Sequence, residues 1–331
     1  MRILVTGCAG FIGSHLSEEL LDRGHEVVGV DCFTDYYARA IKNANLSHLR
    51  DSSRFTLAEV DLAEAELAPL LDGVDIVYHQ AAQPGVRGSW GTQFETYVRN
   101  NVMVTQRLLE AAVLHTSRLS RFVYASSSSI YGNTSELPTN ESICPKPVSP
   151  YGVTKLAGEH LVQLYWRSHG LPTVSLRYFS VYGPRQRPDM AFHRFIQAAL
   201  CDEPLYIFGN GEQTRDFTFV SDAVAANIAA GESHVVGMAI NVGGGSRVSV
   251  NTVIDLLGEL LGRRLKVEYL PVELGDVQDT SADTFTARKL LGFTPTVQLK
   301  AGLAAELEWI QKQFYDGASA RELAGSVVLA D

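Results

Sequence analysis

A glycine-rich turn between an apolar strand and a helix constrains this chain more than any other feature. The apolar run at residues 3–5 leads into Gly7, Gly10 and Gly13, and leucines at helical spacing follow. Glycines here allow a tight turn, close approach of the backbone to a pyrophosphate, and close packing of the helix on the strand. The helix N-terminus would supply N–H donors and a positive dipole. The spacing therefore predicts a dinucleotide site, against the alternative of a tight turn without a ligand.

The second predicted strand ends at Asp31, eighteen residues after Gly13. A carboxylate at this place can accept both ribose hydroxyls of adenosine, and it would repel a 2′-phosphate. No arginine follows until Arg39. The sequence therefore favours NAD over NADP, and the alternative is an Asp31 that only caps the next turn.

Short apolar segments alternate with segments of helical period along much of the chain. The expected strands are residues 3–5, 27–30, 55–60, 74–79, 122–126, 174–178 and 240–242. Strand–helix repetition is typical of a parallel sheet with helices on both faces. We therefore predict an α/β fold with a Rossmann-type doubly wound parallel sheet of about seven strands.

Beyond residue 179 this rhythm breaks, and glycine and proline separate shorter elements. We therefore predict a smaller mixed α/β domain in this part of the chain. Residues 217–230 and 240–242, however, continue the helix and strand pattern of the first domain. We expect the two domains to interleave, with residues 1–178 and 216–244 in the NAD-binding domain and residues 179–215 and 245–331 in the smaller domain. Only the last dozen residues resemble a tail.

Composition and charge exclude several classes of protein. The net charge is −9 and no run of Lys and Arg occurs, so we expect no nucleic-acid partner. The four cysteines are far apart without a Cys-x-x-Cys pair, which favours reduced thiols over a disulfide set or a zinc site, and we expect no metal. The first strand begins too early for a signal peptide, and no apolar run is long enough for a membrane span. The sequence thus predicts a soluble cytoplasmic protein.

Tyr151 and Lys155 lie four residues apart at the start of a predicted helix, directly after Pro150. They share one helix face, so the ammonium can lower the pKa of the phenol and make it a usable base. A serine hydroxyl from the end of the fifth strand, residues 126–129, can complete a proton relay to a substrate oxygen. Tyr-x-x-x-Lys alone is most often a solvated helix face, but in a nucleotide-binding sheet it indicates a catalytic site.

With these motifs the chain resembles the extended short-chain dehydrogenases/reductases of the nucleotide-sugar epimerase/dehydratase family, and most closely the UDP-glucuronate 4-epimerases. The likeness covers residue 1 to about residue 310. The matching stretches are residues 7–13, 61–62, 79–87, 101, 126–132, 151–155, 176–184, 187–191, 209–216 and 275–277. Val104 departs from the family pattern, which usually has glycine there.

The resemblance implies Tyr151 as catalytic base, Lys155 as its electrostatic partner and nicotinamide-ribose ligand, and Ser127 as the hydroxyl of the triad. The expected cofactor-binding residues are Gly7, Gly10, Phe11, Ile12, Gly13, Asp31, Asp61, Leu62, Ala81, Ala82, Asn101, Tyr151, Lys155 and Tyr178. The expected residues for the UDP-sugar are Val86, Arg87, Ser127, Ser128, Ser129, Tyr151, Ser180, Arg185, Arg187 and Arg215. Among them Arg215 is expected on the diphosphate.

Two serines discriminate between the reactions of the resembled family. Dehydratases place an Asp-Glu pair in the two positions after the triad hydroxyl, and the decarboxylases that make UDP-xylose carry a Glu at the second. Here these positions are Ser128 and Ser129. What remains is 4-epimerisation: transient oxidation at C4, rotation of the 4-keto sugar, and return of the hydride. The expected reaction converts UDP-glucuronate to UDP-galacturonate.

A glucuronate substrate passes through a β-keto acid that can lose CO₂, so its carboxylate must be held. Ser128, Ser129, Ser180 and either Arg185 or Arg187 are available, and a bidentate arginine suits a carboxylate. Arg185 is the first choice because it follows Gly183-Pro184, whereas Arg187 precedes a proline that favours extended backbone. The alternative for both arginines is a phosphate or surface contact.

Other functions stay open at this point. The first alternative is a 4-epimerase of UDP-glucose or UDP-N-acetylglucosamine, followed by a UDP-glucuronate decarboxylase. A non-catalytic NAD-binding regulator is the alternative from another class, but it has no need of a tuned phenol.

The resemblance also implies a homodimer through a four-helix bundle, formed by the helices that contain residues 101–112 and 151–166. Leu161, Leu164 and Tyr165 would supply part of the apolar contact. The alternative is that these residues pack on the sheet of their own chain.

Overall fold

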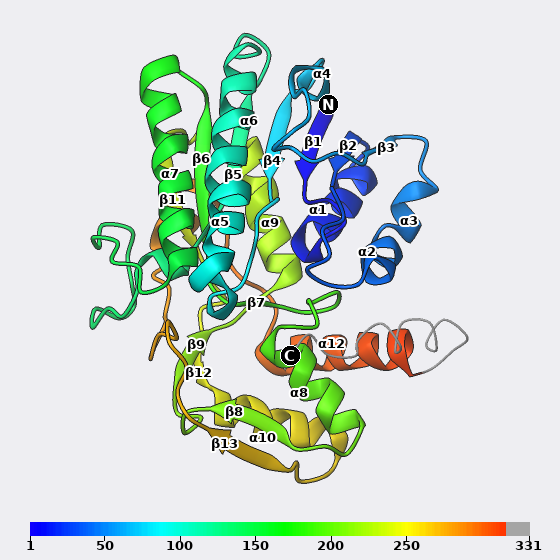
Figure 1. Cartoon of the computed structure of the whole chain (residues 1–331), viewed down its shortest axis with the longest axis vertical. Helices are drawn as coiled ribbons and strands as arrows, with labels where there is room; N and C mark the ends of the chain where they lie inside the picture. Colours follow the sequence, from blue (N-terminus) through cyan, green and yellow to red (C-terminus); the bar gives the residue numbers. More distant parts are fainter. Residues whose placement is uncertain (316–331) are drawn as a thin grey trace.

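The computed structural model describes residues 1–315, and a seven-stranded parallel sheet forms its centre (Figure 1). The strands are β1 (Arg2–Thr6), β2 (Glu26–Val30), β3 (Phe55–Ala58), β4 (Ile76–His79), β5 (Arg121–Ser127), β6 (Thr173–Tyr178) and β11 (Met238–Val242). Their order is β11-β6-β5-β4-β1-β2-β3, and every neighbouring pair is parallel. Each predicted strand overlaps one of these strands. The predicted Rossmann-type doubly wound sheet is therefore confirmed.

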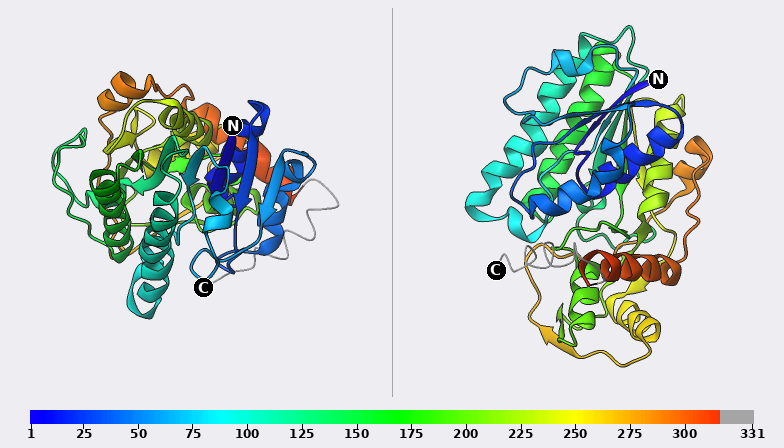
Figure 2. Two further views of the ribbon diagram at one scale, coloured as in Figure 1. Left: turned by 90° about the horizontal axis from the view of Figure 1, so that it is seen from above. Right: turned by 90° about the vertical axis from the view of Figure 1, so that its right-hand side faces the viewer.

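Helices cover both faces of the sheet (Figure 2). One face carries α1 (Phe11–Asp22), α9 (Val220–Glu232) and α11 (Phe285–Leu291), and the other carries α4 (Ala68–Leu71), α6 (Val104–Val113) and α7 (Pro150–His169). Successive residues of a strand serve opposite faces: Ile3 packs in the core on the α1 side, and Leu4 packs in the core on the α6 side. Burial on both faces explains why the strands read as continuous apolar runs.

A smaller lobe lies below the sheet in Figure 1. Its elements are α8 (Ala191–Leu200), α10 (Val250–Leu261) and α12 (Leu299–Phe314), with the parallel pair β8 (Leu205–Phe208) and β13 (Val267–Leu270). They share a core that includes Ile196, Leu257 and Leu303. The interleaved domain boundaries given above stay a prediction, and residues 316–331 lie outside the described residues.

The remaining strands and helices are short. The strands are β7 (Val181–Tyr182), β9 (Thr214–Asp216), β10 (Thr218–Phe219) and β12 (Arg247–Ser249). The helices are α2 (Arg39–Asn45), α3 (Ser47–Arg50), α5 (Phe94–Tyr97), the 3-10 turns η1 (Arg87–Ser89), η2 (Gly91–Gln93) and η4 (Ser128–Ile130), and the π-helical η3 (Val98–Met103). Within residues 1–315, no helix has the length and apolar character needed to cross a membrane.

Candidate active site

A cavity of about 240 Å³ opens at the carboxyl ends of the sheet strands, where doubly wound sheets bind their ligands. Most of the predicted cofactor residues line it. They are Gly7, Gly10, Phe11, Ile12, Gly13, Asp31, Asp61, Leu62, Ala81, Ala82, Tyr151, Lys155 and Tyr178. The cavity therefore joins the glycine turn to the Tyr151–Lys155 pair, although these segments are far apart in the sequence.

The glycine turn has no room for side chains. Gly7 has a φ of +70°, and a Cβ built on Gly13 would lie 2.1 Å from the Gly7 carbonyl oxygen. A Cβ on Gly7 itself would lie 2.9 Å from the Ala81 nitrogen. Gly10 occupies the N-cap of α1 and has no side chain to bind the first N–H groups. This bare helix start at the cavity fits the pyrophosphate of NAD.

The Asp31 carboxylate is held in place at the end of β2. Its oxygens accept hydrogen bonds from the Ala9 N–H at 3.1 Å and the Phe33 N–H at 2.8 Å. The Lys42 ammonium lies 4.0 Å away and donates to the Thr34 carbonyl oxygen at 2.8 Å. The carboxylate is thus fixed at the place where a ribose diol of NAD would need it.

Asn101 lies behind the cavity rather than on its wall. Its Oδ1 accepts from the Gln83 N–H at 2.7 Å, and its Nδ2 donates to the Thr154 hydroxyl at 3.0 Å. The side chain thereby joins the loop after β4 to α7. Val104, the departure from the resembled family, is buried and lines the cavity immediately after the π-helical η3.

The start of α7 brings Tyr151 to the end of β5. Ser149 caps the helix by accepting from the Gly152 N–H at 3.1 Å, and Pro150 occupies its first turn. Gly152 packs so closely that a Cβ there would lie 2.6 Å from the Ser129 carbonyl oxygen. This approach places Tyr151 beside Ser127, whose hydroxyl also accepts from the Ser129 N–H at 3.1 Å.

Burial and neighbouring groups set the proton affinities of this pair. Burial raises the pKa of Tyr151, whereas the Ser127 hydroxyl and the Arg187 guanidinium lower it. Burial lowers the pKa of Lys155 to about 7, and the Glu159 carboxylate opposes that shift. The charge that lowers the phenol pKa in the structure comes from Arg187, and the expected effect of Lys155 on this pKa stays a prediction.

The two candidate arginines for a substrate carboxylate have different surroundings. Arg185 has a φ of +65° and pairs through Nη2 with Glu18 of α1 at 2.6 Å, and its buried Nη1 has no partner within the described residues. It does not line the cavity. Arg187 lines the cavity and forms a two-pronged contact with Asp189, with both distances 2.9 Å. The geometry therefore favours Arg187 and gives no support to the first choice of Arg185.

Other predicted substrate residues lie in the segments after β5 and β6 and in β9. Ser128 and Ser129 form η4 at the end of β5, and Ser180 lies between β6 and β7. Arg215 is in β9, and its guanidinium donates to the Gln278 carbonyl oxygen at 3.1 Å.

Val86 and Arg87 bring a loop of the sheet domain against the smaller lobe. Arg87 pairs with Asp276 at 2.7 Å and lies 3.9 Å above the Phe208 ring. Val86 packs close to Gly275, where an added Cβ would lie 3.1 Å from a Val86 methyl carbon. Both residues therefore border the junction between the lobes, as a sugar-nucleotide site between two domains requires.

Sequence reasoning missed several groups on the cavity wall. Tyr36, Tyr37 and Lys42 line it from the segment after β2, and Gln80 lines it from the loop after β4. The Tyr36 hydroxyl donates to Asp189 at 3.2 Å and so joins this segment to the Arg187 contact. The two adjacent tyrosines that follow Asp31 so closely could have been recognised as residues of the cavity wall. Nothing in the sequence links Tyr36 to Asp189.

Comparisons with known proteins identify the family of this chain. A profile of the "NAD dependent epimerase/dehydratase family" matches residues 3–243. A Bacillus subtilis (strain 168) protein named an uncharacterized UDP-glucose epimerase, YtcB, is 46% identical over 316 residues, which are 95% of this chain and 99% of that protein. The UDP-glucuronate 4-epimerase of Thermodesulfobacterium geofontis (strain OPF15) is 38% identical over 311 residues, which are 92% of this chain and 95% of that protein.

Solved structures show the same relationship. The crystal structure of UDP-glucuronic acid 4-epimerase from Bacillus cereus, in complex with UDP-glucuronic acid and NAD, is 46% identical. It superimposes with a TM-score of 0.92 and covers 95% of this chain and 100% of that one. These findings confirm the resemblance inferred from the motifs: the chain belongs to the NAD-dependent epimerase/dehydratase family.

Proposed function

We propose that this chain is an NAD-dependent 4-epimerase that converts UDP-glucuronate to UDP-galacturonate. The observation that carries the proposal is that Tyr151, half-buried and next to Ser127, lines the same cavity as the glycine turn and Arg187. The Bacillus cereus structure, which contains UDP-glucuronic acid and NAD and bears the same activity in its name, supports it.

NAD, when bound, supplies a reversible hydride acceptor for C4 of the sugar. The residues that would hold it are the glycine turn for the pyrophosphate, Asp31 for the adenosine ribose, and Lys155 for the nicotinamide ribose. Tyr151 takes the O4 proton as the hydride leaves C4 and returns a proton after the 4-keto sugar has rotated. The Ser127 hydroxyl hydrogen bonds O4 and keeps it aligned with the phenol.

Arg187 holds the C6 carboxylate of the sugar in this proposal, with Ser128, Ser129 and Ser180 as further donors. A guanidinium can grip a carboxylate with two parallel hydrogen bonds, as Arg187 grips Asp189 in the structure. This grip keeps the carboxylate from aligning with the C4 carbonyl, which suppresses loss of CO₂. Dehydration is not expected because Ser128 and Ser129 offer no carboxylate to expel a hydroxyl.

NMR analysis of products tests the proposal. The purified chain is incubated with UDP-glucuronate, UDP-glucose or UDP-N-acetylglucosamine, without added NAD. The expected result is UDP-galacturonate from UDP-glucuronate and slower or no conversion of the neutral sugars. Formation of a UDP-pentose with release of CO₂ would identify a decarboxylase. Binding without turnover of any of the sugars would identify a regulator.

A second candidate function is 4-epimerisation of UDP-glucose. The Bacillus subtilis relative at 46% identity has UDP-glucose in its name, and both prongs of Arg187 are occupied by Asp189 in the structure. If this contact persists with substrate bound, Arg187 is not available to bind a carboxylate of the sugar. The same product analysis would then show UDP-glucose as the faster substrate.

We also propose that the chain forms a homodimer through α6 and α7. The exposed apolar side chains of Val153 and Leu164 on α7 and of Met103 in η3 support this pairing. Tyr165 is instead buried in its own chain, where its hydroxyl donates to Glu110 of α6. Light scattering after gel filtration is expected to show a dimer, and Leu164→Asp is expected to shift it toward monomer. A cytoplasmic location stays a prediction.

A further inference from the structure

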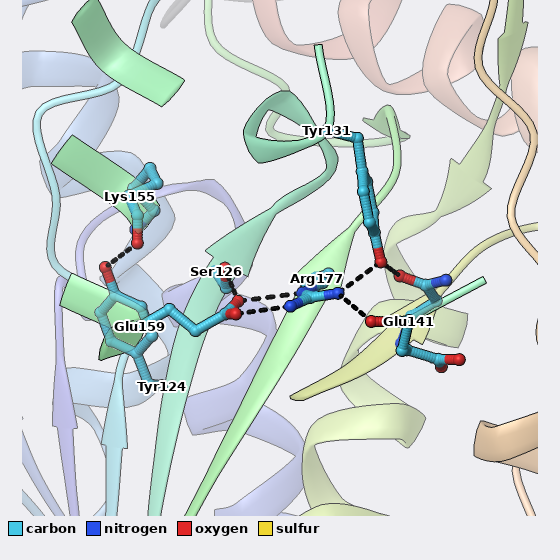
Figure 3. A network of polar contacts seen from close by, with 8 residues as sticks. Tyr124, Ser126, Tyr131, Glu141, Lys155, Glu159 and Arg177 are labelled. Carbon is cyan, nitrogen blue, oxygen red and sulfur yellow. Dashed lines mark hydrogen bonds and ion pairs between the residues drawn. The ribbon is translucent and has the colours of Figure 1, made fainter. Parts of the chain in front are cut away.

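A buried ion pair joins α7 to β6 of the sheet (Figure 3). Glu159 on α7 accepts two hydrogen bonds from Arg177 on β6, at 2.6 and 3.0 Å. Ser126 on β5 donates to the same carboxylate at 2.6 Å. Both members of the pair are almost completely buried. Three hydrogen bonds to one buried carboxylate fix it in position.

The same arginine extends the network to the loop that follows the predicted catalytic serines. Arg177 donates to the Tyr131 hydroxyl at 2.6 Å, and this hydroxyl donates to Asn241 of β11 at 2.7 Å. Arg177 also donates to the Glu141 carbonyl oxygen at 3.3 Å. Ser126 precedes Ser127 directly, so the network begins one residue from the proposed triad hydroxyl.

Glu159 also lies one helical turn after Lys155, and residues at this spacing share a helix face. The Lys155 ammonium is buried and lies 4.8 Å from the centre of the Tyr124 ring. The helix is close to β5 here, because a Cβ on Gly158 would lie 2.2 Å from the Tyr124 hydroxyl. On the β5 side, protein groups therefore replace water around Lys155, whereas its other side lines the cavity. A nearby carboxylate on the protein side can compensate part of its charge.

The other titratable and charged groups around this part of α7 do not offer that compensation. They are His79 of β4, Tyr97 of α5, Arg99 of η3, Arg107 and Glu110 of α6, Tyr124 of β5, Arg177 and Tyr178 of β6, and Arg187 after β7. The Glu110 carboxylate accepts a hydrogen bond from the Tyr165 hydroxyl, and Arg99 forms an ion pair with Asp61. The pKa of His79 is lowered to about 3 by burial and by the Lys155 charge, so its ring is neutral. Glu159 is therefore the carboxylate placed to act on Lys155.

We propose that Glu159 and Arg177 are positioning residues of the epimerase: Glu159 keeps Lys155 charged, and Arg177 fixes the Glu159 carboxylate between α7, β5 and β6. The pair contacts neither sugar nor cofactor. Its effect reaches the reaction through Lys155, which must be charged to assist the Tyr151 phenolate and to donate to a ribose. The inference deepens the proposed function and rests on it only for its kinetic test.

The main test removes both charges with the double variant Glu159→Gln/Arg177→Met, which leaves no unpaired guanidinium in the core. Loss of Glu159 lowers the pH at which Lys155 loses its proton. The alkaline limb of kcat against pH is therefore expected to move about one pH unit toward acid, within the range an adjacent opposite charge produces. An unmoved alkaline limb would overturn the proposal. Arg177→Lys retains both charges and is expected to leave this limb in place.

A measurement without turnover separates this inference from the proposed function. The titration of Lys155 is followed by NMR with isotope-labelled lysine, and Lys155→Met assigns the resonance. The midpoint is expected at lower pH in the double variant than in the wild type, and equal midpoints would overturn the inference. A wild type that turns over no UDP-sugar would refute the proposed function and leave this comparison valid.

Two further variants separate an effect on Lys155 from a loss of stability. Arg121→Met removes another buried arginine of the sheet, which donates to the Val235 carbonyl oxygen at 2.9 Å at the opposite end of β5. It is expected to lower thermal stability without moving the Lys155 titration. Glu159→Asp keeps both charges of the ion pair and moves the carboxylate back by the length of one methylene group. If the double variant does not fold, Glu159→Asp replaces it in the Lys155 titration. A midpoint below that of the wild type is again expected, and an unchanged one overturns the proposal.

Discussion

Replacing Arg187 by alanine tests how the site recognises a charged sugar. Arg187 lines the cavity and holds the Asp189 carboxylate through two hydrogen bonds of 2.9 Å. If a substrate carboxylate takes the same guanidinium, Arg187→Ala removes a charge-assisted contact. Such contacts contribute about 1.5–3 kcal/mol, which corresponds to roughly a 10- to 150-fold loss.

A second effect of Arg187 must be separated from the first. Its charge lowers the pKa of Tyr151, so its removal leaves less phenolate available for every sugar. That loss is common to charged and neutral substrates and cancels in a ratio. The quantity that reports the carboxylate contact is therefore kcat/KM for UDP-glucuronate divided by kcat/KM for UDP-glucose, compared between variant and wild type.

The matched control is Arg185→Ala, two residues away. Arg185 pairs with Glu18, so its loss is expected to leave the ratio unchanged, whereas Arg187→Ala is expected to lower it by roughly 10- to 150-fold. For a neutral sugar that is not turned over, dissociation constants replace kcat/KM. Arg187→Ala is also expected to release CO₂ with a UDP-pentose, because the 4-keto acid is no longer held. Equal losses on both sugars, or a selective loss in Arg185→Ala, would refute the assignment.

Three further predictions follow from the site and the core. Tyr151→Phe is expected to lower kcat by about 10²- to 10⁴-fold while NAD is still released on denaturation, and a variant with nearly full activity would exclude Tyr151 as the base. Asp31→Ala is expected to weaken retention of NAD, and wild-type protein that releases NADP(H) would contradict the ribose assignment. Glu306 is buried, its Oε2 accepts from the Gly183 N–H at 2.8 Å, and its other oxygen has no partner within the described residues. Burial raises the pKa of Glu306, so the stability it contributes is complete below its unfolded pKa and is lost as the pH rises through the folded value. Glu306→Gln is therefore expected to raise Tm at about pH 8 by an amount that vanishes near pH 4, worth about 1.4 kcal/mol per pKa unit, and an equal Tm at both pH values would refute this.

Much of the fold could be read from local sequence. The strands of a parallel sheet are buried on both faces, so each is a short apolar run, and β1 to β6 and β11 all overlap predicted segments. The glycine turn could also be predicted from the sequence, because only glycine fits at residue 13. A Cβ there would lie 2.1 Å from the Gly7 carbonyl oxygen. That β11 belongs to the same sheet followed from resumption of the strand–helix pattern, whereas its position at the edge came from the structure.

The sequence predicted the candidate site only where its residues belong to a local motif. Tyr151 and Lys155 share a helix turn, and Ser127 ends a strand, so their pattern indicates a joint role. The choice between Arg185 and Arg187 depended on loop conformation, which the nearby prolines did not determine. In the structure Arg185 takes a φ of +65° and pairs with Glu18, a residue 167 positions away.

The sequence by itself determined the order of strands and helices, the glycine turn and the spacing of Tyr151 and Lys155, because each depends on residues within one turn or one strand. Only the tertiary structure decided which charges act on these groups. Arg177 reaches Glu159 because β6 lies beside β5 beneath α7, and Arg187 reaches the cavity because the chain folds back after β7. Electrostatic effects depend on distance and burial in space, and these are fixed only when distant segments pack together.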